Sequence, residues 1–204
     1  ARKEEVAAIL TNEHGKVTSD ALGEVARGLE VVEFATSIPH LMKGEHSENV
    51  STGVDVYSVH QPLGVVGIIT PWNAPVNLAL GPLVSALYTG NTVVLKPSPY
   101  TPATTLKLGE ILKDIFPAGV VNVLAGGAEL GAWMTEHVGI DKISFTGSVA
   151  TGKKVLASAA ATLKRVTLEL GGNDAAIVLD DVDPTAIAKK IFFASFVNSG
   201  QVCM

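Results

Sequence analysis

The sequence predicts an α/β fold in which helices cover a doubly wound parallel sheet. From about residue 62 onward, short apolar runs alternate with longer segments of helical periodicity. This alternation is typical of βαβ units, and βαβ units build parallel sheets. The apolar runs are continuous in Val, Ile and Leu, as expected for strands that are covered on both faces.

The elements of the sheet follow one another along the chain. We expect a strand where a Val/Ile/Leu run is bounded by turn residues, and a helix where apolar residues recur at helical spacing. The expected strands are residues 64–70, 91–97, 120–127, 142–147, 165–172 and 175–180. The expected helices are residues 75–90, 102–116, 128–138, 148–160 and 183–197.

The segment before residue 62 has a different pattern. Ala1–Thr11 predicts a helix, and a second helix is expected to follow an N-cap at Asp20. Residues 43–53 are polar and rich in turn-forming residues, which predicts a loop. Residues 54–70 alternate and then become continuously apolar, so we expect two strands there, of which the second is buried.

The composition narrows the class of protein. The formal net charge is −5, and no basic stripe of the kind that binds nucleic acid is visible. The single cysteine cannot form an internal disulfide, which fits a reducing, cytoplasmic compartment. The apolar runs are shorter than the roughly 18 residues of a membrane helix. The five histidines have no ligand spacing, so we expect no metal site.

Polar or glycine-rich clusters follow the first five strands of the predicted sheet. They read TPWNAP, KPSPYTP, AGGAELG, TGSVATG and ELGGND. In a doubly wound sheet, ligands bind outside the carboxyl ends of the strands. We therefore expect the chemistry of this protein in these clusters.

Two of the clusters suit the binding of an anionic cofactor. Gly147 permits a tight turn and Ser148 is a natural N-cap, so this helix start is a candidate phosphate site. An ordinary capped helix is the alternative. Lys96 lies at a strand end, where it is either a ligand for ribose or phosphate or a solvated edge lysine. The strict G-x-G-x-x-G fingerprint of dinucleotide sites is absent from the chain.

Three further residues suit catalysis. Glu169 lies late in an apolar strand and is either a general base or an exposed strand-end carboxylate. Asn73 lies between Pro71 and Pro75, where a rigid loop aims an amide at an oxyanion, although asparagine is also common in plain turns. Cys203 follows an expected helix and carries a strongly nucleophilic thiol, although a lone cysteine is more often a small buried residue.

Taken together, five blocks resemble the NAD(P)-dependent aldehyde dehydrogenase superfamily. TPWNAP, KPSPYTP, FTGSVATG, LELGGND and NSGQVCM occur in the order and at roughly the spacing of that family, over essentially the whole chain. The resemblance implies the Rossmann-like cofactor domain of the aldehyde dehydrogenase fold. It also implies oxidation of an aldehyde to a carboxylic acid with NAD or NADP, through a thiohemiacetal and a thioester on cysteine.

The resemblance assigns roles to individual residues. Cys203 resembles the family nucleophile, Asn73 the oxyanion-binding amide, and Glu169 the base that activates water. Lys96 resembles the lysine that contacts the adenosine ribose, and Ser148 the pyrophosphate contact. The full set of expected cofactor-binding residues is Ile69, Thr70, Trp72, Lys96, Ser98, Gly127, Gly147, Ser148 and Leu170.

Some positions depart from the family pattern. Pro99 stands where many NAD-preferring members have glutamate, so the choice between NAD and NADP stays open. Asn173 stands where lysine is common, and nothing in the sequence explains that change. Residues 37–58 resemble the methylmalonate-semialdehyde branch, which acylates coenzyme A. Glu169 and Val202 both differ from that branch and favour hydrolysis.

Two functions from other classes remain as alternatives. The first alternative is a nucleotide-binding module that binds the cofactor but catalyses no reaction. The second is a thiol hydrolase in which a histidine serves as the base for Cys203, but no histidine lies at an expected strand end.

The resemblance also implies how the chain is divided. Residues 1–61 are expected to form a helical arm and an oligomerisation ribbon, 62–180 the NAD(P)-binding domain, and 181–204 the start of a catalytic domain. Family members extend beyond both ends, so we expect an internal segment with little or no dehydrogenase activity on its own. The full-length protein is expected to be a homodimer or homotetramer that acts on a small-molecule aldehyde.

Overall fold

Five strands form one parallel sheet in the computed structural model, which describes residues 2–203. The strands are β3 (Val65–Ile69), β4 (Thr92–Lys96), β5 (Val121–Val123), β6 (Lys142–Gly147) and β7 (Arg165–Leu170). Their order across the sheet is β5-β4-β3-β6-β7, and every neighbouring pair is parallel. The chain builds outward from β3 in one direction and then returns to place β6 on the other side. The switch point of the sheet therefore lies between β3 and β6.

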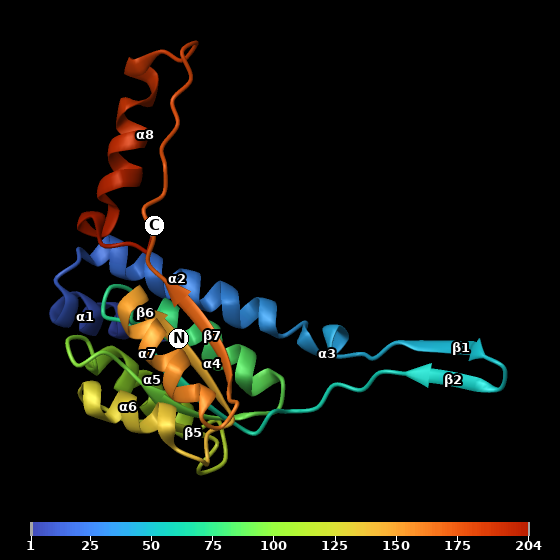
Figure 1. The fold of residues 1–204 in the computed structure, drawn as a ribbon. Helices are drawn as coiled ribbons and strands as arrows, with labels where there is room; N and C mark the ends of the chain where they lie inside the picture. The colour runs from blue at the N-terminus through green and yellow to red at the C-terminus, as the bar shows by residue number, and fades with distance from the viewer. Residues whose placement is uncertain (1, 204) are drawn as a thin grey trace.

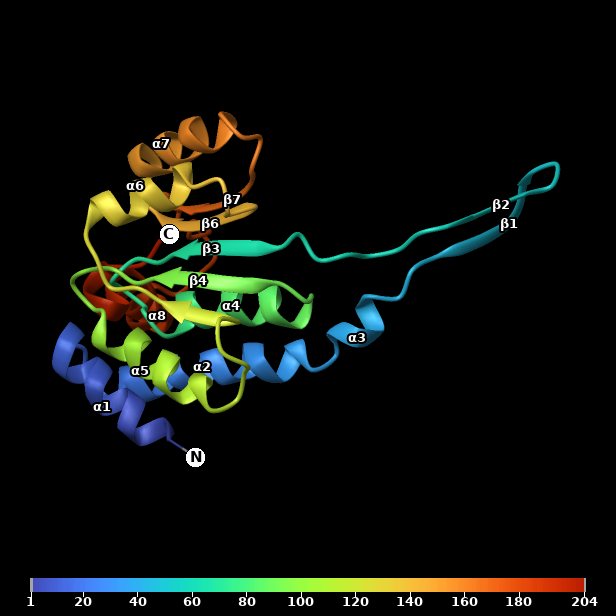
Figure 2. The ribbon, with the colours of Figure 1, turned by 90° about the horizontal axis from the view of Figure 1, so that it is seen from below.

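Helices cover both faces of this sheet. They are α1 (Lys3–His14), α2 (Thr18–Ala35), α4 (Asn77–Tyr88), α5 (Ala103–Lys113), α6 (Ala128–Glu136) and α7 (Val149–Ala160). Figure 2 shows α4 and α5 on one face, with α1 and α2 outside them, and α6 and α7 on the other face. This arrangement confirms the predicted doubly wound α/β fold.

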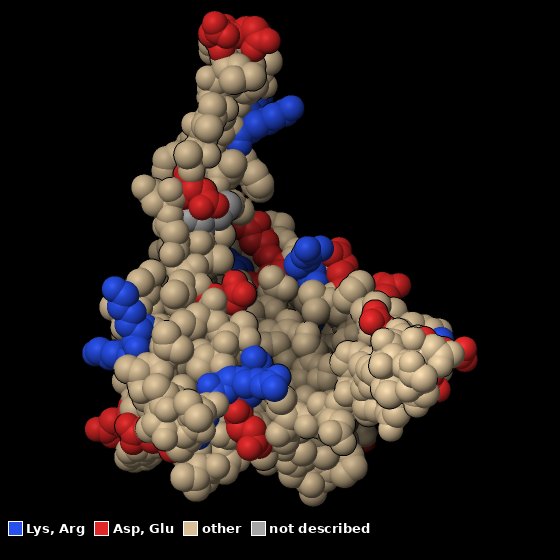
Figure 3. Space-filling model, turned by 45° about the vertical axis from the view of Figure 1, so that its right-hand side comes forward, with Lys and Arg blue, Asp and Glu red and all other residues tan. Residues whose placement is uncertain are grey.

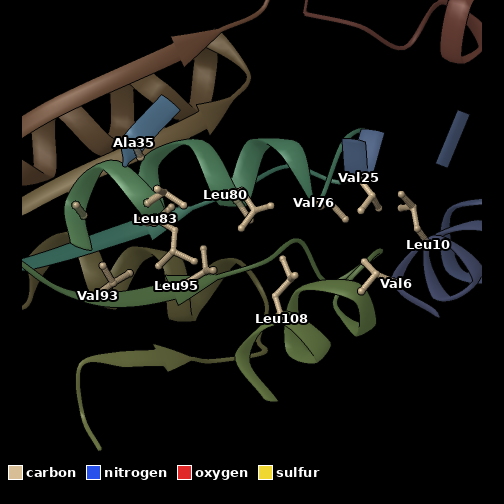
Figure 4. Close-up of a cluster of buried hydrophobic side chains, with 14 of the residues drawn as sticks. Val6, Leu10, Val25, Ala35, Val76, Leu80, Leu83, Val93, Leu95 and Leu108 are labelled. Carbon is tan, nitrogen blue, oxygen red and sulfur yellow. The ribbon is translucent and has the colours of Figure 1, made fainter. Parts of the chain in front are cut away.

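Alternate strand residues fill two separate apolar cores. On β3, Val66 and Ile68 belong to the cluster with α4 and α5, whereas Ile69 packs on the cluster with α6 and α7. Successive residues of a strand point to opposite faces, so one apolar run serves both cores. In Figure 4, Leu83 of α4 and Leu95 of β4 point toward each other within the first cluster.

The first 61 residues contribute both to the core and to a projecting ribbon. Val6, Leu10 and Val25 of α1 and α2 are buried in the first cluster. After the short α3 (Ile38–Leu41), β1 (His46–Ser51) and β2 (Val54–Tyr57) pair in an antiparallel ribbon. Figure 1 shows this ribbon extending away from the body of the molecule.

Two sequence predictions for this region are wrong. The loop expected at residues 43–53 is occupied by β1, all of whose residues are exposed. Without a buried face, no apolar alternation marks the strand in the sequence. The helix α2 begins after Val17, so Asp20 lies in its first turn and is not the N-cap. A carboxylate is favoured at either place by the positive end of the helix dipole, so the two positions give similar sequence signals.

The strand predicted at residues 175–180 is also absent. Ile177, Val178 and Leu179 are 83%, 51% and 63% exposed in an extended segment. A strand needs a hydrogen-bonded neighbour, and within residues 2–203 nothing pairs with this segment. The predicted helix follows as α8 (Pro184–Phe196), then the 3₁₀ turn η1 (Val197–Gly200). No residue of α8 is buried.

The charged side chains on one face of the molecule are of mixed sign. On the face drawn in Figure 3, side chains of both charge signs are scattered, without a continuous basic stripe. Within the described part of the chain, no helix has both the length and the apolarity to cross a bilayer. Nor do residues 2–203 contain a group of three or more His, Cys, Asp or Glu side chains placed to hold a metal ion.

Candidate active site

The loop after β3 carries Asn73 to the carboxyl edge of the sheet. The N–H of Thr70 donates to the carbonyl of Lys96 at 3.1 Å, which extends the ladder between β3 and β4 by one residue. Pro71 and Pro75 then restrict the backbone on both sides of Asn73. Asn73 therefore lies on a constrained loop beside the switch point.

The N-terminus of α7 lies at the same edge. The Ser148 hydroxyl accepts the N–H of Thr151 at 3.2 Å, which confirms the predicted N-cap. Gly152 lets the helix approach β7 closely, because a Cβ at this position would lie 2.7 Å from Leu170 Cδ2. The remaining N–H groups of the first turn and the positive end of the helix dipole are available at this edge.

A left-handed turn leads into the segment that carries Cys203. The φ angles of Asn198, Ser199 and Gly200 are 53°, 57° and 72°. Glycine adopts this conformation without strain, and asparagine is enriched there among other residues. The turn reverses the chain after α8 and returns it to the loop of Asn73.

Hydrogen bonds join these two loops. Asn73 Nδ2 donates to the carbonyl of Gln201 at 2.9 Å. Asn198 Nδ2 donates to the carbonyl of Asn73 at 3.0 Å and to that of Gln201 at 3.2 Å. Both acceptors are backbone groups, so the bonds fix the two main chains relative to each other. Cys203, two residues after Gln201, has an exposed side chain.

A cavity of about 300 Å³ opens where these segments meet. The predicted site residues in its lining are Trp72, Asn73, Gly147, Ser148 and Cys203. The structure thus brings together residues from three segments that are far apart in the sequence. A neighbouring cavity of about 390 Å³ shares Asn73 and Cys203 and extends to Lys16 and Glu24.

Glu169 is exposed near the end of β7 and lies outside the Cys203 cavity. It is paired in register with Thr146 of β6 and lines a cavity of about 740 Å³ between the sheet and α4. Thr146 lines this cavity and the Cys203 cavity alike. The same wall includes Lys142 and Thr167, so this face of β6 and β7 is polar and open. The expectation that every strand is buried on both faces is therefore wrong for β7.

The other predicted cofactor-binding residues lie at or after the carboxyl ends of the strands, outside the lining of the Cys203 cavity. Lys96 is only 4% exposed, its Nζ donates to the carbonyl of Pro97 at 3.0 Å, and burial lowers its pKa. It is therefore not a solvated edge lysine. The hydroxyl of Ser98 is buried and accepts the N–H of Tyr100 at 3.2 Å. The rest of the set is Ile69, Thr70, Gly127 and Leu170.

Trp72 is held in place by α1. Its ring stacks on that of His14, with centroids 5.8 Å apart and planes inclined by 24°. Neither ring nitrogen of His14 has a hydrogen-bond partner among residues 2–203. Burial lowers the pKa of His14, and the positive charge of Lys16 lowers it further.

Three residues that the sequence analysis did not single out organise the site. Lys16 Nζ donates to Glu24 Oε2 at 2.6 Å and to the carbonyl of Asn73 at 3.0 Å. Asn198 bridges the two loops as described above. The Asn-Ser-Gly sequence was a usable signal for the turn at Asn198. No local pattern connects Lys16 with Asn73, because only the tertiary fold brings them together.

This fold and this site define a doubly wound α/β protein with a thiol and an amide near the switch point of its sheet. The model of the aldehyde dehydrogenase family matches residues 1–204, and the chain belongs to that family. It is 43% identical over 204 residues to a probable aldehyde dehydrogenase of Pseudomonas sp. It is 43% identical over 196 residues to the aldehyde dehydrogenase LUC3 of Fusarium sp. The chain spans 41% of the length of each of these relatives.

Solved structures agree with this membership. An NAD-dependent aldehyde dehydrogenase from Sinorhizobium meliloti matches 99% of the chain with a TM-score of 0.94 and 38% identity, over 41% of its own length. PnpE, which comes from Pseudomonas sp. WBC-3, matches 99% with a TM-score of 0.94 and 36% identity in its complex with nicotinamide adenine dinucleotide, over 42% of its length. An NADP-dependent enzyme from E. coli matches 99% with a TM-score of 0.95 and 34% identity, over 42% of its length.

Proposed function

We propose that the whole protein oxidises an aldehyde to a carboxylic acid with NAD⁺ or NADP⁺. The observation that carries the proposal is the cavity at the switch point, where Cys203, Asn73 and the N-terminus of α7 come together. A nucleophile, an oxyanion donor and an anion-binding helix end are the parts that this reaction needs.

The residues present fit a nicotinamide dinucleotide. The hydroxyl oxygen of Thr70 is buried at the carboxyl edge and has no hydrogen-bond partner among residues 2–203. Lys96 Nζ has further N–H groups beside its bond to the carbonyl of Pro97. The start of α7 offers N–H groups to a pyrophosphate. Ile69, Ser98, Gly127 and Leu170 complete the proposed binding edge, with Gly127 at the N-cap of α6.

The chain's own residues perform the covalent chemistry in this proposal. The thiol of Cys203 gives its proton to solvent water as its sulfur bonds to the aldehyde carbon, and Asn73 Nδ2 with the N–H of Cys203 holds the resulting oxyanion. When bound, the nicotinamide would accept the hydride that leaves the thiohemiacetal carbon, so that a thioester would remain on Cys203. Glu169 then takes a proton from the water that attacks the thioester carbon. The carbon–sulfur bond breaks, Cys203 leaves as a thiolate, and the acyl group is released as the carboxylic acid. The place of Glu169 beside Thr146, which lines the Cys203 cavity, supports this role.

The direct experiment uses the full-length protein encoded by the gene. A panel of aldehydes is tested with NAD⁺ and with NADP⁺, and formation of the reduced cofactor is followed by absorbance. Cys203→Ser is expected to lower kcat at least ~10³-fold while cofactor affinity stays within a few-fold, because the serine hydroxyl is a poor nucleophile at its free pKa. Turnover that survives this substitution would overturn the assignment of the nucleophile.

The same panel separates hydrolysis from acylation of coenzyme A. The likeness of residues 37–58 to the acylating branch supports acylation of coenzyme A. Glu169 and Val202 instead favour hydrolysis of the thioester by water. Product analysis with and without coenzyme A decides between a carboxylic acid and an acyl thioester. An unchanged rate and an acid product in both conditions are expected.

The proposal extends to the organisation of the whole protein. We propose that residues 62–180 form the cofactor domain, that 181–204 lead into a catalytic domain, and that the full-length protein is a homodimer or homotetramer. The projecting ribbon supports association, because Val54, Val56 and Tyr57 of β2 are 46–72% exposed. Sedimentation of the full-length protein tests this part.

A further inference from the structure

Lys16 and Glu24 form a buried ion pair between the N-terminal helices and the Asn73 loop. Their side chains are 6% and 7% exposed, and Nζ lies 2.6 Å from Oε2. Lys16 follows the C-cap of α1, and Glu24 lies on α2. The pair therefore bridges from the helical layer to the loop that follows β3.

Lys16 holds the middle of the segment between β3 and α4, and Glu24 holds its end at the start of α4. Lys16 Nζ donates to the carbonyl of Asn73 at 3.0 Å. Glu24 Oε1 accepts the N–H groups of Val76 at 2.8 Å and Asn77 at 3.3 Å. The N-cap of α4, Val76, has no side chain that could cap the helix, so the carboxylate from α2 does so.

Stability alone is a poor explanation for such a pair. Removing two charges from water is costly, and well-packed apolar residues in place of a buried pair are often neutral or stabilising. The pair fixes the orientation of the loop that carries Asn73, because its hydrogen bonds end on the backbone of that loop. The backbone carbonyl of Asn73 accepts hydrogen bonds from Lys16 and Asn198. The side-chain amide of Asn73 donates to the carbonyl of Gln201.

We propose that Lys16, oriented by Glu24, is a positioning residue that aims the Asn73 amide at the oxyanion formed on Cys203. This inference rests on the proposed function. One N–H of Asn73 Nδ2 is occupied by the carbonyl of Gln201, which leaves the other N–H available to an acceptor in the cavity that Asn73 and Cys203 both line. A small rotation of the Asn73 peptide would misdirect that second N–H.

The test compares kcat, KM and stability in variants of the full-length protein. Lys16→Met keeps much of the side-chain volume and removes the donor to the Asn73 carbonyl. Its kcat is expected to fall about 10- to 100-fold, with KM for the aldehyde within about threefold, because oxyanion contacts form only in the transition state. Lys16→Met combined with Glu24→Gln removes the unpaired charge and keeps the acceptor for Val76. This double variant is expected to regain thermal stability but not kcat.

A second comparison asks whether Lys16 acts through Asn73. Residues that act as a unit are not additive, so Lys16→Met is expected to add nothing further to the loss in Asn73→Ala. Glu13→Gln serves as the matched control, because Glu13 ties α1 to α5 without contacting Asn73. It is expected to lower stability and leave kcat within about twofold.

The possible failures are distinguishable. If Asn73→Ala leaves kcat unchanged, the proposed oxyanion role fails, and the inference fails with it. If Asn73→Ala lowers kcat but the two losses multiply, or if kcat of the double variant recovers together with stability, Lys16 is structural only and the proposed function stands.

Discussion

Among single residues, Glu169 separates the two halves of the proposed reaction. In Glu169→Gln, Cys203 and Asn73 stay in place, so oxidation as far as the thioester is expected to continue. Hydrolysis loses its base, and steady-state turnover of the full-length protein is expected to fall about 10²- to 10⁴-fold. Rapid mixing is then expected to show a burst of about one reduced cofactor per site, followed by a slow phase.

The exposed Glu136 at the end of α6 provides the control for that experiment. Glu136→Gln is expected to show neither the burst nor the loss of turnover. A Glu169→Gln protein with unchanged steady-state turnover would assign the base to another group.

His14 is expected to give the stability of the chain a pH dependence. Burial lowers its pKa in the folded state, so below the unfolded value of about 6.5 the unfolded chain binds more protons than the folded one. The free energy of unfolding is therefore expected to decrease as pH falls from about 7 to 5. His14→Phe keeps an aromatic ring against Trp72 and is expected to flatten this dependence in urea titrations. His40→Gln, at an exposed position, should leave the slope as it was.

At the scale of elements, α1 is tied to α5 through Glu13. Its carboxylate accepts the N–H groups of Ala103 at 2.7 Å and Thr104 at 2.9 Å, and also the Thr104 hydroxyl. It thus caps a helix whose own N-cap, Pro102, offers no side-chain acceptor. Glu13→Gln loses the negative charge and one of the two acceptor oxygens, and it is expected to lower the free energy of unfolding by about 1 kcal/mol.

Chemical denaturation measures this loss. Glu4→Gln, an exposed change in the first turn of the same helix, is expected to cost only a few tenths of that amount. Equal losses in the two variants would mean that the contact with α5 adds nothing to stability.

Helices and strands whose own residues show apolar periodicity could be predicted from the sequence. Strands that depend on whether a partner strand pairs with them could not. The five sheet strands and the helices between them follow directly from apolar periodicity. The exposed strand β1 carries no such pattern, and residues 175–180 carry the pattern without a partner strand. In the site, the clusters at strand ends were predictable because a parallel sheet places them at one edge. The contact of Lys16 with Asn73 depends on how α1 and α2 pack, which no local motif encodes.

For the whole molecule, the two parts of the proposed site differ in how firmly they are held. The edge formed by β3, β4 and β6 rests on two buried cores. In contrast, α8 has no buried residue, and Phe192, Phe193 and Phe196 are 60–68% exposed. The proposed cofactor edge therefore lies on a packed scaffold, whereas in this chain Cys203 follows a helix without a buried residue.

This difference predicts that the 204-residue chain alone binds the cofactor without turning over an aldehyde. Trp72 lines the Cys203 cavity beside Gly147 and Ser148, so binding there is expected to change its fluorescence. The second tryptophan, Trp133, is 62% exposed, and Trp133→Phe removes its background signal. Titration of this variant with NAD⁺ and NADP⁺ should give a saturable change, while reduced cofactor stays undetectable in the presence of aldehydes. A flat titration would mean that the edge is not a cofactor site in this chain. Formation of reduced cofactor would mean that the Cys203 segment is already ordered for catalysis, despite the exposure of α8.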